Sequence, residues 1–263
     1  METSLQEDPR SAAGNPGQSI AIHRLNERNE RKPANTSVSS GWPARERVIW
    51  FTSDEPLARP GGNQTIAYLI AQRLIDVIGA LSIGLLASPV IVATFLVLLV
   101  TTKGRPLFSQ ERVGFCGRRF RMYKFRSMTL DADALQHLVG NEMCGPAFKN
   151  RRDPRITRIG RWLRKTSIDE LPQLWNVLWG DMSLVGPRPL PTREIARCTD
   201  RQLQRLAVKP GLTCRWQVSG RNDVGFDEWI EMDLWYVANQ SVQTDLALLL
   251  KTPWCVLTGR GAY

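Results

Sequence analysis

The sequence predicts a mostly helical α/β protein with a small β-hairpin or sheet. It also predicts a membrane-embedded segment, either a re-entrant helical hairpin or a kinked spanning helix, joined to a cytosolic domain. Three observations lead there. Residues 77–102 form an uncharged run of 26 residues, long enough for a membrane segment. Strand-like alternation follows in residues 105–128, and helical spacing of apolar residues prevails from residue 155 onward. The 263 residues suffice for one large or two small domains.

The first 65 residues are expected to form a disordered tail. They are rich in Ser, Asn, Pro, Arg and Glu and lack sustained periodicity. No apolar core follows a basic start, so they do not resemble a signal peptide. They hold eight basic and eight acidic side chains, which places the whole net charge of +10 in residues 66–263. Such a charge predicts a polyanionic partner: nucleic acid, an anionic membrane surface or a phosphorylated substrate.

Cysteine and histidine usage excludes several classes of protein. The five cysteines are widely spaced and contain no C-x-x-C pair, which argues against a disulfide framework or a zinc site. Reduced thiols on a cytosolic face fit this pattern. Only two histidines occur, His23 and His137, and His23 lies in the polar tail. A zinc enzyme or a Ser-His-Asp hydrolase is therefore not expected.

The uncharged run contains Ser88-Pro89 near its middle. Proline removes one helical hydrogen bond and clashes with the preceding turn. Each half, 77–88 and 89–102, would reach only about 18–21 Å, less than the roughly 30 Å hydrocarbon core. Two short helices broken at Ser88-Pro89 could enter and leave on the same side. A kinked spanning helix is the alternative, and basic residues on both flanks leave the crossing direction open.

A hairpin is expected next, with Gly114 and Gly117 framing its turn. Its second strand, Arg119–Met128, alternates basic and apolar residues and would present Arg121, Lys124 and Arg126. The remaining pattern predicts a loop at 141–155, an irregular stretch at 212–225, and helices over 130–140, 155–165, 169–180, 226–240 and 244–258. The last two helices suit either a bilayer interface or a packed helical core.

Asp169 and Glu170 stand side by side in the most basic part of the chain. The structural interpretation is a capping box, Ser167-x-x-Glu170, at a helix start. The functional interpretation places the positive helix end at the Asp169 carboxylate, which would keep it ionised as a nucleophile or metal ligand. Attack on phosphorus would need Mg²⁺ and arginines to offset the negative charges, and Arg164 and Arg188 could supply that clamp.

Four segments carry a resemblance to a known family. They are KFRSM (124–128), DPRITRIGRWLRKTSIDELPQLWNVLWGDMSLVGPRP (153–189), KPGLTCRWQVSGR (209–221) and LTGRGAY (257–263). In this order they closely resemble the bacterial sugar transferases, monotopic phosphoglycosyl transferases that act on polyprenyl phosphate. The resemblance covers about residues 66–263.

The resemblance implies an activity and a location. A sugar 1-phosphate would pass from a UDP-sugar, with glucose or galactose as the usual sugars, to undecaprenyl phosphate, and UMP would be released. This would be the first membrane step of exopolysaccharide or other polysaccharide biosynthesis, on the cytosolic face of the bacterial inner membrane. Membrane lipids are expected partners and nucleic acid is not. The sugar and the oligomeric state, including a homo-oligomer, stay open.

The resemblance also assigns residues. Asp169 would be the nucleophile and a Mg²⁺ ligand, and Glu170 its partner in proton or metal handling. Phosphates would be held by Arg164 and by Arg188 of the Pro187-Arg188-Pro189 turn. Lys124 and Arg126 would line the basic pocket, and Ser88-Pro89 matches the helix-breaking pair of the family.

Three domains are thus expected: a tail (1–65), a re-entrant membrane segment (66–103) and a cytosolic phosphoglycosyl transferase domain with interfacial amphipathic helices (104–263). Long family members carry a further polytopic membrane domain before this unit, so the chain resembles a short form. The competing hypothesis is a membrane-tethered protein that binds nucleic acid or anionic lipid without catalysis. That hypothesis accounts for the charge but not for acids at the centre of the most basic region.

Overall fold

The structure is a computed structural model that describes residues 65–220 and 224–258. The predicted disordered tail lies outside these residues, apart from Thr65. The helices are α2 (Ile66–Thr101), α3 (Arg158–Thr166), α4 (Leu174–Trp179), α5 (Thr192–Ile195), α6 (Asp200–Leu203), α7 (Arg215–Ser219), α8 (Phe226–Ala238) and α9 (Val242–Thr258), with 3-10 helices η1 (Phe115–Gly117), η2 (Ala134–Leu138), η3 (Ile168–Gln173) and η4 (Gln204–Ala207). The strands are β1 (Leu107–Val113), β2 (Arg119–Phe125), β3 (Ser183–Val185), β4 (Leu190–Pro191) and β5 (Gly211–Thr213). The mostly helical prediction is confirmed for the described residues.

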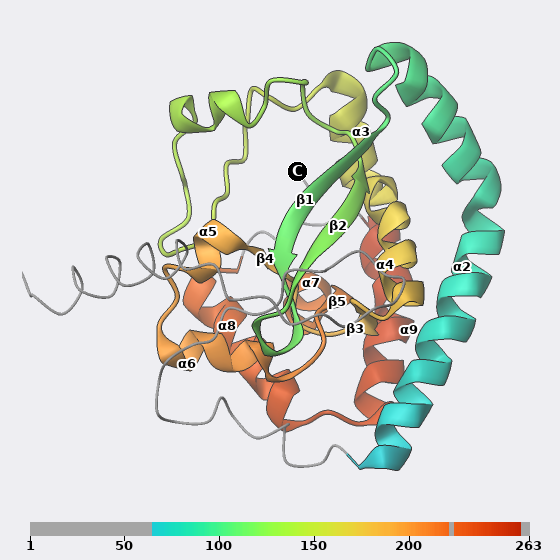
Figure 1. Ribbon diagram of the computed structural model, residues 1–263, viewed down its shortest axis with the longest axis vertical. Helices are drawn as coiled ribbons and strands as arrows, with labels where there is room; N and C mark the ends of the chain where they lie inside the picture. The colour runs from blue at the N-terminus through green and yellow to red at the C-terminus, as the bar shows by residue number, and fades with distance from the viewer. Residues whose placement is uncertain (1–64, 221–223, 259–263) are drawn as a thin grey trace, which may run out of the picture. The chain divides into compact units, whose positions relative to one another are not determined.

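Helix α2 is one continuous helix of 36 residues that includes Pro89. The Thr65 side chain caps its start by accepting a hydrogen bond from the backbone N–H of Tyr68. The hydroxyl of Ser88 donates to the carbonyl of Leu85 at 2.7 Å. The expected pair of separate helices is therefore replaced by a single helix, which Figure 1 shows bowed. A proline removes one hydrogen bond and bends a helix whose other bonds persist. The re-entrant course stays a prediction.

The two halves of α2 have different surroundings. The N-terminal half is tied to the rest of the fold, because Asp76 accepts hydrogen bonds from the Ser183 hydroxyl and the Leu184 N–H, both at 2.8 Å. Arg73 donates to two carbonyls at the C-terminal end of α4. The C-terminal half exposes most of its apolar side chains, and only 11% of the most apolar stretch of the helix is buried. Helix α2 is long and apolar enough to cross a membrane, and such an exposed apolar surface is compatible with insertion.

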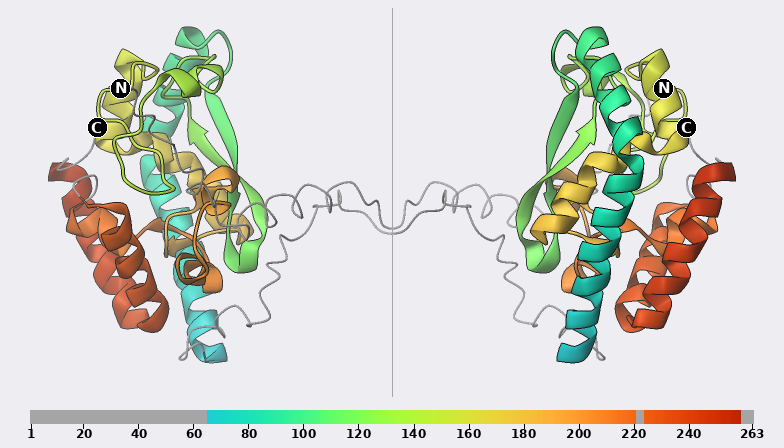
Figure 2. Two further views of the ribbon diagram at one scale, coloured as in Figure 1. Left: turned by 90° about the vertical axis from the view of Figure 1, so that its left-hand side faces the viewer. Right: turned by 90° about the vertical axis from the view of Figure 1, so that its right-hand side faces the viewer.

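The predicted hairpin is confirmed. Strands β1 and β2 pair antiparallel from Leu107↔Phe125 to Val113↔Arg119, and β4 joins the free edge of β1. The connecting turn contains Cys116 at φ 52°. Figures 1 and 2 show this hairpin on one side of the fold, with α4 between it and α9 in the side view. The sequence did not predict the second sheet, in which β3 and β5 pair in parallel.

Several predicted elements differ in detail. Residues 130–140 contain the 3-10 helix η2 rather than an α-helix, and the expected helix over 169–180 begins as η3 and becomes α-helical only in α4. Gly180 ends α4 in the left-handed region, as predicted. The stretch 212–225, expected to be irregular, contains α7 and the end of β5. Helices α8 and α9 match the predicted ranges within two residues.

Candidate active site

Asp169 and Glu170 lie in the first turn of η3, directly after α3. Ser167 links the two helices in a left-handed conformation, φ 58°, and its side chain caps neither of them. The predicted capping box is therefore wrong, because the left-handed turn leads the chain sharply into η3. Glu170 instead directs its carboxylate to side chains from β2 and from the turn after β3.

Glu170 is held by two cations. Its Oε1 lies 3.0 Å from Nζ of Lys124, and Arg188 donates from both terminal nitrogens, with Nη1 at 3.2 Å from Oε2. Burial acts to raise the pKa of Glu170, but Arg188 and Lys124 outweigh it and hold the pKa far below its usual range. Burial lowers the pKa of Lys124 to about 8, although Glu170 opposes the shift. Glu170 is consequently a fixed anion that orders two cations.

Asp169 differs from its neighbour. Its side chain is 5% exposed and lines the same cavity, yet no hydrogen bond among the described residues engages its carboxylate. Burial raises the pKa of Asp169 to about 6, against the attraction of Lys124, and the adjacent Glu170 adds to the rise. Burial, and not the helix end invoked from the sequence, is the largest influence on this pKa. At neutral pH the carboxylate is still mostly ionised and available to a ligand.

The Pro187-Arg188-Pro189 turn is held from behind by two arginines. Prolines have no N–H, so the turn offers mainly carbonyls for bonding. Arg205 donates to the carbonyl of Arg188 at 2.7 Å, and Arg112 donates to the carbonyl of Pro189 at 3.0 Å. A buried ion pair of 2.6 Å with Asp233 in α8 fixes Arg205 in turn.

Two close backbone contacts set the positions of these elements. A Cβ on Gly160 in α3 would lie 1.8 Å from the carbonyl oxygen of Ser127, so only glycine lets α3 pack against the end of β2. The packing brings Nε of Arg164 to 3.0 Å from the Ser127 hydroxyl. Gly186, which directly precedes the proline turn, packs against Gly211, where a Cβ would lie 2.0 Å from the Gly186 backbone nitrogen.

These residues surround a cavity of about 380 Å³. Eight basic and five acidic side chains line it, a surplus of three positive charges suited to phosphates. We call one side of the cavity the ionic wall; it consists of Lys124, Asp169, Glu170 and Arg188. Arg164, Arg126 and Pro189 also line the cavity, whereas Pro187 does not. The Arg126 guanidinium is engaged elsewhere, since it donates to the carbonyls of Arg105 and Leu107.

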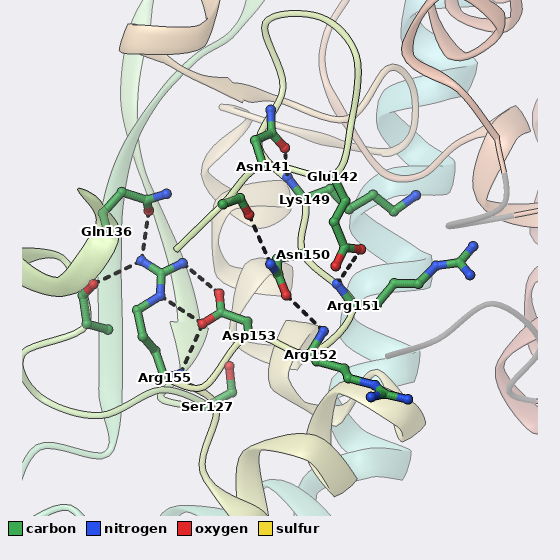
Figure 3. A network of polar contacts seen from close by, with 12 residues as sticks. Ser127, Gln136, Asn141, Glu142, Lys149, Asn150, Arg151, Arg152, Asp153 and Arg155 are labelled. Carbon is green, nitrogen blue, oxygen red and sulfur yellow. Dashed lines mark hydrogen bonds and ion pairs between the residues drawn. The ribbon is translucent and has the colours of Figure 1, made fainter. Parts of the chain in front are cut away.

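The opposite side of the cavity, which we call the loop wall, consists of residues 129–155 together with α5. Figure 3 shows its hydrogen-bond network. Arg155 binds Asp153 through two nitrogens and also donates to Gln136 and to the carbonyl of Ala132. Around Asn141, backbone N–H groups and carbonyls bond to amide side chains. This wall is therefore ordered by side chain–backbone bonds rather than by regular secondary structure.

The residues fit a magnesium ion in one manner. Within the described ranges, no group of three or more His, Cys, Asp or Glu side chains is placed to hold a metal. Mg²⁺ commonly binds through one or two carboxylates together with substrate phosphates. The carboxylate of Asp169, free of hydrogen bonds inside a cationic cavity, is suited to such shared binding, whereas Glu170 is already occupied by Lys124 and Arg188.

Sequence reasoning brought Lys124, Arg164, Asp169, Glu170 and Arg188 together correctly as neighbours of one cavity. Their chemical roles stay predictions. It missed Arg112 and Arg205, whose side chains support the proline turn. The sequence carries no signal for either of them, because Arg112 follows Gln110 and Glu111, and Arg205 follows Gln204, in ordinary polar stretches.

The fold and the cavity together define a class: a protein with a helix suited to a membrane and a cationic cavity lined by the buried, unbonded carboxylate of Asp169. The chain belongs to the bacterial sugar transferase family, whose family model matches residues 67–259. It is 50% identical over 200 residues to the galactosyl transferase CpsE of Streptococcus agalactiae, covering 74% of this chain and 44% of that protein.

Two further relatives differ in the share of their own length that the match covers. The undecaprenyl-phosphate galactose phosphotransferase of Salmonella typhimurium is 46% identical over 199 residues, which cover 73% of this chain and 41% of the relative. The exopolysaccharide production protein ExoY of Rhizobium meliloti is 36% identical over 200 residues, 74% of this chain and 88% of the relative. The match thus spans less than half the length of the first two relatives and most of the third.

Proposed function

We propose that the chain transfers a sugar 1-phosphate from a UDP-sugar to undecaprenyl phosphate and releases UMP, as the first membrane step of polysaccharide biosynthesis. Family membership supports this proposal, and so do the names of two relatives, a galactosyl transferase and an undecaprenyl-phosphate galactose phosphotransferase. We take galactose or glucose as the transferred sugar. The competing hypothesis of a binding protein without catalysis leaves the free carboxylate of the ionic wall without a purpose.

The observation that carries the proposal is the contrast between the two adjacent acids. Glu170 is neutralised by Lys124 and Arg188, while Asp169 faces the cavity with no hydrogen bond. In the proposed reaction an Asp169 oxygen attacks the β-phosphorus and forms an aspartyl phosphosugar. The bond from that phosphorus to the bridging oxygen breaks, and UMP leaves with the bridging oxygen and its electron pair. An oxygen of undecaprenyl phosphate then attacks the same phosphorus and releases the Asp169 carboxylate.

The surrounding cations would stabilise the charge that develops on phosphorus. Lys124, Arg164 and Arg188 line the cavity with Asp169 and can contact phosphate oxygens on different sides. A Mg²⁺ ion shared between Asp169 and the diphosphate would offset the repulsion between the two anions. Glu170, with its depressed pKa, is a poor proton acceptor at neutral pH, so its proposed role is to hold Lys124 and Arg188 in place.

The membrane arrangement is part of the proposal. We infer that α2 enters and leaves the cytosolic face of the bacterial inner membrane, so that both of its ends stay in the cytosol. In oriented membranes a cysteine placed at Ser40 and the native, exposed Cys116 should then be labelled from the same side, in a chain whose other cysteines are serine. Labelling from opposite sides would show a spanning helix and reject the re-entrant course.

Turnover by the full chain in detergent or nanodiscs tests the reaction. UDP-galactose and UDP-glucose are supplied separately with Mg²⁺, with and without undecaprenyl phosphate. We expect UMP release that continues only when the acceptor is present, and a protein mass increased by one phosphosugar when it is absent. Absence of UMP release with every UDP-sugar tried would reject the proposed activity. UMP release without any mass increase would reject the covalent intermediate.

A further inference from the structure

A third acid, Glu194, belongs to the same cavity and has no part in the proposed chemistry. It lies in α5, directly after the short strand β4 that pairs with β1, and so it is placed by the sheet that also carries Arg112. Its side chain lines the cavity, and the residue is only 8% exposed. A carboxylate is costly to bury, so its place in the wall of a cavity requires a reason.

The internal contacts of Glu194 use half of the carboxylate. Its Oε1 accepts a hydrogen bond from the backbone N–H of Phe148 at 3.3 Å, which ties α5 to the loop wall. Within the described residues no ion pair or further hydrogen bond engages Oε2. Burial raises the pKa of Glu194, while Arg112, Arg193 and Arg205 act to lower it. The carboxylate therefore has one bound oxygen and one without a partner among the described residues, and it belongs to a residue that lines the cavity.

The charges in the cavity limit the kinds of ligand that Oε2 of Glu194 can bind. A phosphate would be repelled by a carboxylate, and no group of metal-ligating side chains surrounds Glu194 among the described residues. Neutral hydrogen-bond donors remain. Both Glu170 and Glu194 act electrostatically on Arg112, so Glu194 belongs to the same cationic neighbourhood as the ionic wall. A ligand whose phosphates lie on the ionic wall would thus bring its adjoining hydroxyl groups towards α5.

We propose that Glu194 binds vicinal hydroxyl groups of the sugar nucleotide, so that the loop wall recognises the polyhydroxyl part of the donor. This inference rests on the proposed function for the identity of the ligand. The hydroxyls belong either to the ribose or to the transferred hexose, and the chemistry of recognition is the same for both. A site that hydrogen-bonds a substrate hydroxyl discriminates strongly against analogues that lack it.

Glu194→Gln separates this role from a structural one. Glutamine keeps an oxygen that can accept from the Phe148 N–H but loses the charged acceptor facing the cavity. Glu231→Gln is the matched control, since Glu231 is an exposed carboxylate in a surface ion pair with Arg201. Affinities of the full-length proteins for UMP and for UDP-galactose are measured by calorimetry in detergent with Mg²⁺ and without acceptor, with Asp169→Asn added to every variant so that UDP-galactose is bound but not consumed.

The two binding measurements distinguish recognition of the ribose from recognition of the hexose. Recognition of ribose predicts that Glu194→Gln weakens binding of both ligands by about 5- to 20-fold, and recognition of hexose predicts this loss for UDP-galactose alone. If UMP binding weakens, 2′,3′-dideoxy-UMP should bind both proteins equally. Unchanged affinities, a persistent loss with the dideoxy compound, or a loss seen only in Glu194→Ala would overturn the proposal. Binding without any UMP release by the parent protein would reject the proposed function and leave this result standing.

Discussion

The two walls of the cavity are built by different physical means. The ionic wall is set on β2, η3 and the proline turn, and its charges hold one another in place. The loop wall includes the 27 residues from Thr129 to Arg155, in which η2 is the only helix. Amide and guanidinium side chains hold its backbone in place. Groups that perform chemistry need fixed geometry, whereas recognition surfaces vary most easily on loops. Under the proposed function, this contrast would divide the reaction and the recognition of the donor between the two walls.

The largest expected effect lies on the ionic wall. Asp169→Asn removes the attacking oxygen while keeping the shape of the side chain, so UMP release should fall by about 10³-fold or more. Because the Asp169 carboxylate makes no hydrogen bonds inside the protein, the thermal unfolding midpoint should stay close to that of the parent. Near-normal turnover in this variant would move the chemistry away from the ionic wall.

Glu170→Gln tests whether charge holds the ionic wall together. The change leaves Lys124 and Arg188 without their shared anion in a half-buried site, which should cost about 2–3 kcal/mol of unfolding free energy. Glu231→Gln breaks an exposed ion pair and should cost less than about 1 kcal/mol. Denaturant unfolding in detergent compares the two variants, and equal losses would contradict the role assigned to Glu170.

The ionic wall should also respond to pH. The proposed reaction requires ionised Asp169, with a pKa of about 6, and protonated Lys124, with a pKa of about 8. The kcat/KM for UDP-sugar should therefore fall about tenfold per pH unit below 6 and fall again above 8. Lys124→Arg keeps the cation charged at high pH, so the alkaline decline should disappear. An unchanged alkaline decline in that variant would assign it to another group.

The smallest effect is expected on the loop wall. Arg155→Lys loses the two-point contact with Asp153 and the bonds to Gln136 and Ala132, so the wall should loosen. We expect KM for UDP-sugar to rise about 3- to 10-fold while kcat changes little. Arg158→Lys, an exposed substitution at the start of α3, is the control. A fall in kcat at constant KM would mean that the loop wall takes part in the chemistry.

The sequence predicted the hairpin, α8 and α9, but it missed the short strands and divided the longest helix, α2, at Ser88-Pro89. The hairpin, α8 and α9 each carry a periodic pattern over seven residues or more. Strands β3 and β5 have three residues each, too few for any pattern, and their pairing depends on contact between distant segments. The capping box failed for a related reason, since the left-handed turn at Ser167 depends on how α3 packs against β2.

The residues of the candidate site likewise include some that the sequence predicted and some that it missed. Asp169, Glu170 and Arg188 could be selected because they sit in one dense segment of acids, arginines and prolines. Arg112 and Arg205 could not, since each acts on a carbonyl that only the folded chain brings near. Nor did the residue pattern show that Glu170, and not Asp169, is the acid bound by two cations. Lys124 and Arg188 single out Glu170, and both contacts come from outside its own helix.

The polar contacts of Asp76 and Arg73 have a mechanical consequence. They fasten α2 to β3 and to the end of α4. Strand β3 ends three residues before Arg188, and α4 follows directly on η3, which carries Asp169 and Glu170. In a bilayer, the lipids would set the depth at which the apolar half of α2 is inserted. The contacts of Asp76 and Arg73 would then fix the distance between the cavity and the lipid surface. In the proposed reaction, α2 would therefore also determine the distance between the bilayer surface and Asp169, and so how far the phosphate of the lipid acceptor must leave the bilayer to react.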